Sequence, residues 1–282
     1  MSHNYRLIVS CPDRVGIVSR VSSFIASQEG SIIEANQHSD LATGRFFMRY
    51  DIRANALSAQ DFRVAFAPIA EEFEMNWRLS DSDRRQRVVV MVSRESHCLV
   101  DLLYRWSAGE LDCDIPCVIS NHDDLRAMVT WYGIDFHHVP VDPNDKASAF
   151  AETERLITAA EADSVVLARY MQILPPDLCQ RYAGRVINIH HSFLPSFAGA
   201  KPYHQAFERG VKLIGATCHY VTEELDAGPI IEQDIQRVSH CHTPQDLVRL
   251  GRDVEKAVLA RGLRWHLQDR VLIHGNKTVV FS

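Results

Sequence analysis

The sequence has no run of 18 apolar residues, and its first residues do not contain the apolar core of a signal peptide. It also has no excess of basic side chains, because 36 aspartates and glutamates outnumber 30 lysines and arginines and give a net charge of −6. These absences predict a protein with no transmembrane span, no basic membrane-binding patch and no basic surface for nucleic acid. We therefore expect a cytoplasmic protein that binds neither nucleic acid nor a membrane.

Cysteine and histidine occur without the spacing of a metal site. The seven cysteines are odd in number and scattered, and the close pair Cys113 and Cys117 has no second pair to complete a zinc site. None of the 14 histidines is followed four residues later by another, as a zinc-binding helix requires. The pattern predicts reduced thiols, no metal and the same cytoplasmic location.

The length of 282 residues predicts two domains. Apolar periodicity over residues 5–82 predicts the element order β-α-β-β-α-β, with Ser58 as a candidate N-cap of the second helix. The expected strands span 5–11, 31–40, 44–53 and 75–80, and the expected helices span 17–28 and 58–73. The polar run at 81–86 is typical of a linker, so we predict domains at 1–82 and 83–282.

The second domain is expected to be a doubly wound, Rossmann-like α/β domain with a mostly parallel sheet. Its first strand is continuously apolar over residues 88–92, which is typical of a strand covered on both faces. Strands and helices then alternate, and ligands of such sheets bind beyond the carboxyl ends of the strands. The expected strands span 115–120, 136–139 and 164–167, and the expected helices span 98–106, 122–131, 147–160 and 243–268.

Three polar residues are candidates for a functional site. Asn188 and His190 alternate at the end of a buried strand expected at 186–189, so both side chains point to the same side. Polar side chains in such a place need partners or a function. Asp226 lies in a turn between the apolar strands expected at 213–221 and 229–235, and this turn can fold back over the strand end. The three residues therefore form either a hydrogen-bonded turn or a catalytic site.

The residues from Asn188 to Gly199, together with the run from Thr222 to Pro229, resemble the family of formyltransferases and hydrolases that use 10-formyltetrahydrofolate. The resemblance extends over essentially the whole chain. It implies attack on a formyl amide carbon, a tetrahedral oxyanion and protonation of the departing amine. It also implies that 10-formyltetrahydrofolate is the substrate and that no cofactor is bound permanently.

The resemblance assigns a role to each of the three polar residues. Asn188 would donate an amide N–H to the oxyanion. His190 would donate to the oxyanion or to the leaving nitrogen. Asp226 would hold His190 in the required state and accept the proton of the attacking nucleophile.

The resemblance also places the pterin ring against the strand and turn at 167–174. The residues expected to bind the substrate are Met171, Gln172, Ile173, Leu174, Ser192, Val221 and Leu225. Ser192 could instead cap a turn, and His191 alternates to the other face of the strand, where it could be a packed histidine. Lys201, in the small-residue stretch that begins at Gly199, could attract the folate glutamate tail, although a solvated surface position is favoured.

The first domain, with its turn from Asp13 to Gly16, resembles an ACT domain. The resemblance implies a ferredoxin-like fold, paired sheets in a homodimer or higher homo-oligomer, and an amino-acid effector at the subunit interface. Asp13 and Gly16 would belong to the effector loop. The alternative is a domain that only supports dimerisation.

The remaining question is whether the formyl group passes to water or to an acceptor. Phosphorylated acceptors are bound in the resembling transferases by a glycine-rich loop after the first strand, whereas residues 93–98 contain no glycine and Glu95 would repel phosphate. His97 in this segment either lies near the pocket or caps the next helix. The chain also lacks a basic extension for tRNA.

We therefore expect a hydrolase that converts 10-formyltetrahydrofolate to tetrahydrofolate and formate in one-carbon and purine metabolism. Two alternatives are kept open. One is a formyltransferase to an amine acceptor of the glycinamide ribonucleotide type. The other is an amino-acid-binding regulator with an inactive catalytic domain, against which the intact set of Asn188, His190 and Asp226 argues.

Overall fold

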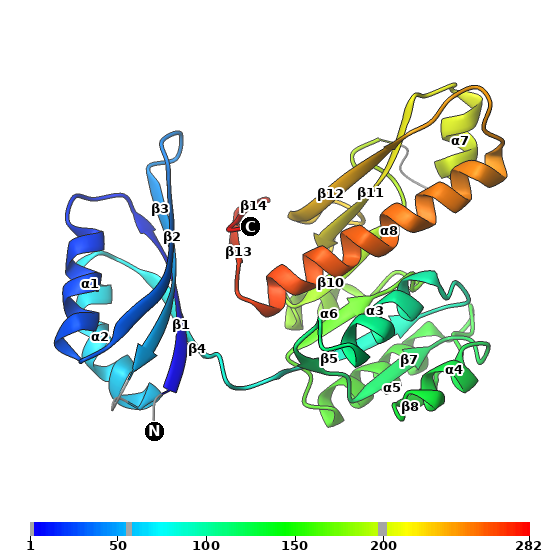
Figure 1. Cartoon of the computed structure of the whole chain (residues 1–282). Coiled ribbons are helices and arrows are strands. Elements are labelled where there is room, and N and C mark those ends of the chain that lie inside the picture. Colours follow the sequence, from blue (N-terminus) through cyan, green and yellow to red (C-terminus); the bar gives the residue numbers. More distant parts are fainter. Residues whose placement is uncertain (1–2, 55–57, 197–201) are drawn as a thin grey trace. The chain divides into compact units, whose positions relative to one another are not determined.

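The computed structural model describes residues 3–54, 58–196 and 202–282, and it divides into two compact units (Figure 1). Gly199 and Lys201 lie outside the described residues. Unit 1 comprises residues 1–85, 268–274 and 279–282, and unit 2 comprises residues 86–267 and 275–278. The first boundary falls three residues after the predicted one, whereas most of the C-terminal tail groups with unit 1 rather than with the second domain.

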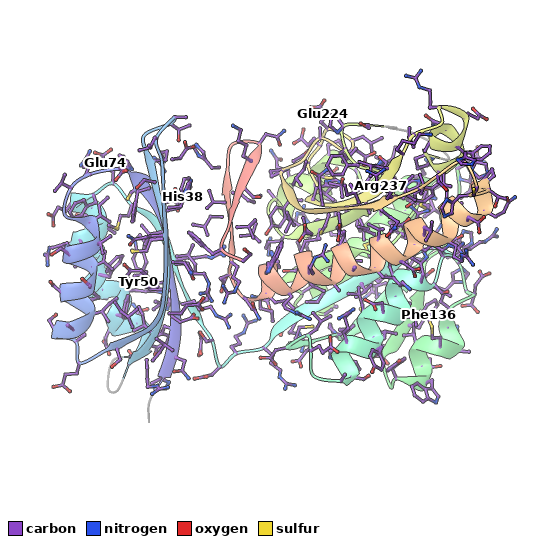
Figure 2. All side chains as sticks on the ribbon, turned by 45° about the horizontal axis from the view of Figure 1, so that its top comes forward. His38, Tyr50, Glu74, Phe136, Glu224 and Arg237 are labelled. Atoms are coloured by element: carbon purple, nitrogen blue, oxygen red, sulfur yellow. The ribbon has the colours of Figure 1, made fainter. Side chains whose placement is uncertain are left out.

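Unit 1 is a four-stranded antiparallel sheet with both of its helices on one face (Figure 1). The strand order is β2-β3-β1-β4, which confirms the predicted β-α-β-β-α-β arrangement. Its elements are β1 (His3–Pro12), α1 (Ile17–Ser27), β2 (Ser31–Asp40), β3 (Arg45–Ala54), α2 (Ala59–Glu72) and β4 (Asn76–Asp81). Ser58 caps α2 by accepting from the backbone N–H of Asp61. Buried aromatic rings, among them those of Phe66 and of Tyr50 (labelled in Figure 2), belong to the core.

A C-terminal hairpin that the sequence analysis did not predict also belongs largely to unit 1. It consists of β13 (Val271–His274) and β14 (Lys277–Val280). Leu272 and Phe281 pack against Ile8 and Phe47 of the sheet, and all four side chains are buried. Because the sheet has apolar side chains on both faces, the face without helices also needs a cover.

Unit 2 contains a sheet of eight strands in the order β12-β11-β10-β9-β5-β7-β8, with the short β6 paired to β5. The run from β10 to β8 is parallel, and β11 and β12 are antiparallel, which confirms the predicted mostly parallel sheet. The strands are β5 (Gln86–Val92), β6 (Cys113–Asp114), β7 (Cys117–Ser120), β8 (Asp135–His138), β9 (Ser164–Leu167), β10 (Val186–His190), β11 (Leu213–Tyr220) and β12 (Ile230–Arg237).

Helices cover both faces of this sheet, as a doubly wound fold requires (Figure 1). They are α3 (His97–Ser107), α4 (Arg126–Trp131), α5 (Lys146–Ala159), α6 (Pro176–Arg181), α7 (Pro202–Glu208) and α8 (Pro244–Leu267). Helices α5 and α6 pack on the sheet through residues such as Ile157 and Leu178, whereas α8 packs against β10, β11 and β12. Within the described ranges, no helix is both long and apolar enough to cross a membrane.

The sheet topology determines where a site can form. Strand β5 has β7, the next long strand in the chain, on one side and β9 on the other, so the strand order reverses at β5. Ligands of open α/β sheets bind at the carboxyl ends of strands beside such a reversal. The segments that follow β5, β9 and β10 begin at Ser93, Ala168 and His191, and they therefore meet at this edge.

Candidate active site

A cleft of about 660 Å³ opens at this edge of unit 2, and Asn188, His190 and Asp226 all line it. Asn188 and His190 lie at the end of β10, where they pair with His219 and Thr217 of β11. Residues directly opposite each other in an antiparallel pair point to the same face, so β10 and β11 together present polar side chains to the cleft. The predicted placement of the two β10 residues on one side therefore agrees with the register.

Asp226 reaches His190 because the turn after β11 folds back over the strand end. A Cβ atom at Gly228 would lie 1.8 Å from the carbonyl oxygen of Tyr220, so only glycine permits this close approach. Asp226 itself has a left-handed φ of 55°, which aspartate tolerates better than most residues. Glu224, labelled in Figure 2, belongs to the same turn.

The carboxylate of Asp226 and the ring of His190 form a pair. Oδ1 of Asp226 lies 3.2 Å from Nδ1 of His190, and this interaction lowers the pKa of Asp226 below its ordinary value. An ionised carboxylate at Nδ1 places the proton of a neutral ring on Nδ1 and leaves Nε2 as the reactive nitrogen. His190 is only 5% exposed, and its Nε2 has no hydrogen-bond partner within the described part of the chain.

His219 is a site residue that the sequence analysis missed. Its Nδ1 lies 2.9 Å from the carbonyl oxygen of Tyr220, so Nδ1 carries a proton and donates it. Burial lowers the pKa of His219, which keeps the ring neutral and makes Nε2 an acceptor. Nε2 lies 3.2 Å from Nδ2 of Asn188. His219 therefore orients the Asn188 amide and leaves one of its N–H groups for a ligand.

The predicted substrate-binding residues from two segments line the cleft together. They are Met171, Gln172, Ile173, Leu174, Val221 and Leu225. Met171, Ile173 and Leu225 are 54%, 67% and 62% exposed, which is unusual for large apolar side chains and is typical of a ligand surface. The backbone N–H of Met171 donates to Oγ of Ser93 at 2.9 Å, so the first segment is held against the end of β5.

Ser192 does not line the cleft, which corrects its predicted role in substrate binding. Its side chain is buried, and Oγ donates to the carbonyl oxygen of Ser196 at 2.8 Å. Its own carbonyl oxygen accepts from the Thr217 hydroxyl. The structure therefore agrees with the alternative of a turn residue, because the hydroxyl is used inside the loop and the carbonyl oxygen is used by β11.

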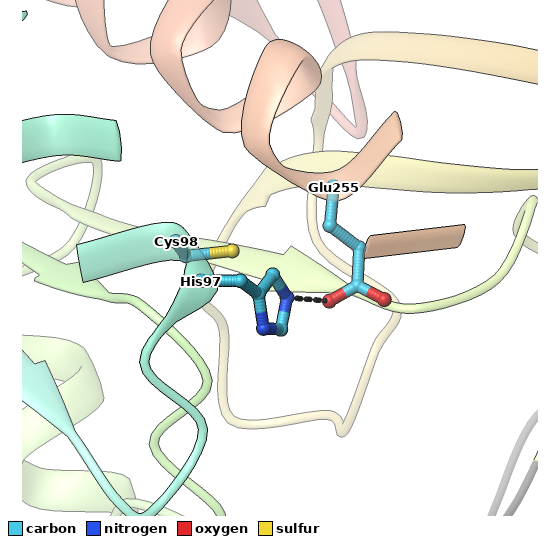
Figure 3. A group of neighbouring side chains, drawn as sticks. All are labelled: His97, Cys98 and Glu255. Carbon is cyan, nitrogen blue, oxygen red and sulfur yellow. Dashed lines mark hydrogen bonds and ion pairs between the residues drawn. The ribbon is translucent and has the colours of Figure 1, made fainter. Parts of the chain in front are cut away.

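Glu255 of α8 is a second residue that the sequence analysis missed. It lines the cleft although its side chain is 1% exposed. One oxygen accepts from Nε2 of His97 at 2.8 Å (Figure 3). The other accepts from the Tyr203 hydroxyl at 2.6 Å, and Nε of Arg169 lies 3.5 Å from the carboxylate. Burial alone would raise the pKa of Glu255, but its neighbours, His97 first among them, lower it. His97 therefore lies in the pocket, one of its two predicted positions.

His97, Cys98 and Glu255 form a group whose ligand atoms lie within 4.8 Å of one another (Figure 3). Such a group could hold a metal ion, but its chemistry fits an ion-pair network better. Burial raises the pKa of the Cys98 thiol well above its ordinary value, whereas a metal binds the thiolate. Both oxygens of Glu255 already accept hydrogen bonds, and the Arg169 guanidinium beside them would repel a cation.

Two histidines of the cleft are held neutral, which predicts that the protein loses stability in mild acid. Burial, with a smaller effect of Arg169, lowers the pKa of His191 from 6.5 to about 3, and burial also lowers the pKa of His219. In the unfolded chain both rings take up protons near the ordinary value, so the unfolded state binds more protons as pH falls. The free energy of unfolding should therefore fall by up to about 1.4 kcal/mol per pH unit for each histidine.

Urea unfolding at about pH 7 and about pH 5 measures this loss. The His191→Gln variant should lose less stability between the two conditions than the unmodified protein, because glutamine does not titrate. A free energy of unfolding that stays constant or rises on acidification would contradict the neutral state of both rings.

Comparisons with known proteins agree with this architecture. The family model described as formyl transferase matches residues 86–263, and the model described as ACT domain matches residues 5–59. The formyltetrahydrofolate deformylase of Synechocystis sp. is 48% identical over 278 residues, which cover 98% of this chain and 98% of the relative. The predicted ACT-like and formyltransferase-like domains are thereby confirmed.

Solved structures give the same result. The crystal structure of a formyltetrahydrofolate deformylase from Pseudomonas syringae pv. tomato is similar with a TM-score of 0.98 and 67% identity, and the match covers 100% of this chain and 95% of that chain. The crystal structure of glycinamide ribonucleotide transformylase 1 from Symbiobacterium toebii has a TM-score of 0.67 and 28% identity. That match covers 73% of this chain and 98% of the other.

Proposed function

The chain belongs to the family of formyltetrahydrofolate deformylases, and on this premise we propose that its cleft hydrolyses 10-formyltetrahydrofolate to tetrahydrofolate and formate. The reaction would serve one-carbon and purine metabolism. The observation that carries the proposal is the placement of Asn188, His190 and Asp226 together at the edge of one cleft. This set supplies a hydrogen-bond donor, a proton-transferring ring and a carboxylate that orients the ring.

The first step is the attack of water on the formyl carbon. Nε2 of His190 accepts a proton from the water while the water oxygen bonds to the carbon. The ionised Asp226 stabilises the positive charge that develops on the ring. The carbonyl oxygen becomes an oxyanion, and the free N–H of the Asn188 amide donates to it.

The second step breaks the bond between the former formyl carbon and N10 of the folate. Nε2 of His190 returns its proton to N10 as that bond breaks, so the amine leaves as a neutral group. The products are tetrahydrofolate and formic acid, which ionises in solution. The apolar wall of Met171, Ile173 and Leu225 would hold the pterin side of the substrate during both steps.

The segment after β5 supports water rather than a phosphorylated amine as acceptor. Glu95 lines the cleft, and its carboxylate lies 2.6 Å from the Arg252 guanidinium. Arg169, the other cleft arginine near this wall, faces Glu255. Both arginines are therefore already paired with carboxylates. The phosphate of an acceptor would have to displace Glu95 or Glu255 in order to bind them.

Replacement of Asn188 by alanine should lower kcat by roughly 10²–10³-fold, because it removes one donor to the oxyanion. The KM for 10-formyltetrahydrofolate should change by less than about threefold, since the amide is used mainly in the transition state. Steady-state kinetics of formate release measure both constants. An Asn188→Ala variant with a normal kcat would exclude the amide as oxyanion donor.

The proposed reaction is tested with purified protein and 10-formyltetrahydrofolate, without any acceptor. Formate and tetrahydrofolate should appear in equal amounts and with multiple turnovers. Glycinamide ribonucleotide, added in a parallel reaction, should neither accelerate substrate consumption nor become formylated. Turnover that requires this acceptor would support the transferase instead.

The regulation, assembly and location expected from the sequence remain proposals. The ACT domain supports an amino-acid effector, and the loop of Asp13 and Gly16 precedes α1 as expected. Gly16 has a left-handed φ of 96°, and Asp13 is exposed. We propose a homodimer or higher homo-oligomer in the cytoplasm, with the effector bound between ACT domains.

A further inference from the structure

We propose that His191 is a catalytic residue of the hydrolysis, and that its ring holds the attacking water beside Nε2 of His190. This inference rests on the proposed function. It concerns a different question, namely which side chain binds and orients the attacking water. The observations are the position of the ring, the way it is held and its charge.

The position of the ring is suitable for this role. His191 directly follows β10 and lines the same cleft as His190. The two ring centroids are 5.2 Å apart with an angle of 49° between the planes. A water that hydrogen-bonds two nitrogens joins atoms that are roughly 4.5 Å apart, so rings at this separation can share one water.

The ring is held by packing rather than by its own hydrogen bonds. Tyr203 packs edge-on against His191, at a centroid distance of 6.2 Å and an angle of 68° between the ring planes. The Tyr203 hydroxyl donates to Glu255, and its ring occupies the space where a Cβ atom at Gly251 would lie. Neither nitrogen of His191 has a hydrogen-bond partner among the residues that the structure describes, so both can bind a ligand.

Burial and the nearby charge of Arg169 keep the ring of His191 neutral, so His191 can orient the water whereas His190 takes the proton. Arg169, Glu255, His190 and Asp226 all influence the ring, and burial together with the Arg169 charge keeps it neutral by lowering its pKa to about 3. A neutral imidazole has one donor and one acceptor nitrogen, so it can orient a water. A ring this weakly basic does not keep a proton at neutral pH. The proton therefore goes to His190, whose Nδ1 is paired with Asp226.

Two substitutions of similar size distinguish water binding from packing. His191→Gln keeps a donor and an acceptor but loses the ring, whereas His191→Phe keeps the ring but loses both polar atoms. We expect kcat for formate release to fall about 10²-fold in His191→Phe with a nearly unchanged KM, because the water is no longer oriented. His191→Gln should retain at least about tenfold more activity than His191→Phe.

The order of the two activities distinguishes a water-binding role of His191 from a packing role. A packing role predicts the reverse order, with His191→Phe the more active variant, and equal activities would also exclude a hydrogen-bonding role. The pair His191→Asn and His191→Leu repeats the comparison with smaller side chains in case phenylalanine disturbs the fold.

Tetrahydrofolate affinity, measured by calorimetry, should be similar in all four variants. If the unmodified protein released no formate, the proposed hydrolysis itself would fail, and this result is distinct from any difference between the variants.

Discussion

Replacement of His190 by alanine is expected to lower the turnover of 10-formyltetrahydrofolate by roughly 10³–10⁴-fold. The ring is the only group in the proposed mechanism that both removes a proton from water and returns one to N10. Its Nε2 is buried and has no partner among the described residues. The neighbouring ring of His191 is too weakly basic to take over the transfer, because burial and the Arg169 charge lower its pKa to about 3. Single-turnover kinetics of formate release measure the loss directly.

Binding should be largely unaffected by this change. The pterin wall of Met171, Ile173 and Leu225 does not depend on His190, so the Kd for tetrahydrofolate should change by less than about threefold. His240→Ala is the matched control, since this exposed histidine lies outside the cleft. A His190→Ala variant with at least a tenth of normal turnover would contradict the assigned role.

Replacement of Asp226 by asparagine is expected to lower turnover by about 10³–10⁴-fold with little change of structure. The carboxylate accepts the Nδ1 proton of His190 at 3.2 Å, whereas an amide NH₂ at the same place would favour the other tautomer. Nε2 would then carry the proton and could not accept one from water. The corresponding substitution in serine proteases, which leaves their geometry intact, has an effect of similar size.

The control for this variant is Asp234→Asn, which removes a carboxylate of β12 that pairs with Arg261 of α8. Its kcat should stay within about threefold of normal, because exposed ion pairs contribute little. The pH profile adds a second readout: since the pKa of Asp226 lies below its ordinary value of 3.8, lowering the pH from about 7 to about 5 should leave the wild-type carboxylate ionised. An Asp226→Asn variant that approaches normal kcat would show that the carboxylate does not set the tautomer.

The sequence predicts those parts of the site that depend on a few neighbouring residues. The alternation of Asn188 and His190 at the end of a buried strand, and the glycine-containing turn at Asp226, are both visible within a few residues. The contact of Asp226 with His190 at 3.2 Å is tertiary, but it agrees with a turn that can fold back over the end of the strand that carries His190. The predicted fold of both domains rests on similar local signals.

The residues that were missed depend on register and on long-range contacts. His219 lies within a largely apolar strand, and only its pairing with Asn188 shows that it faces the cleft. Glu255 lies on the long helix α8, far in sequence from His97 and Tyr203, so helix periodicity alone predicts nothing about its partners. A charged residue in the buried stripe of α8 was the one available signal.

The C-terminal hairpin and Ser192 illustrate two further limits. The continuous apolar run at residues 7–9 of β1 indicates burial on both faces of the sheet, but it does not indicate which segment covers the second face. Ser192 follows the catalytic strand closely, and the resemblance placed it in the active-site loop. Its hydroxyl is nevertheless used by Ser196 inside the loop, which no sequence pattern predicts.

Isotope labelling of the product tests the central claim most directly. Purified protein and 10-formyltetrahydrofolate are mixed in water enriched in ¹⁸O, and the formate is analysed by mass spectrometry. If water is the acceptor, each formate released should carry one oxygen from the solvent, and His190→Ala should release almost none. Unlabelled formate, or consumption of the substrate without formate, would show that the formyl group does not pass to water in this cleft.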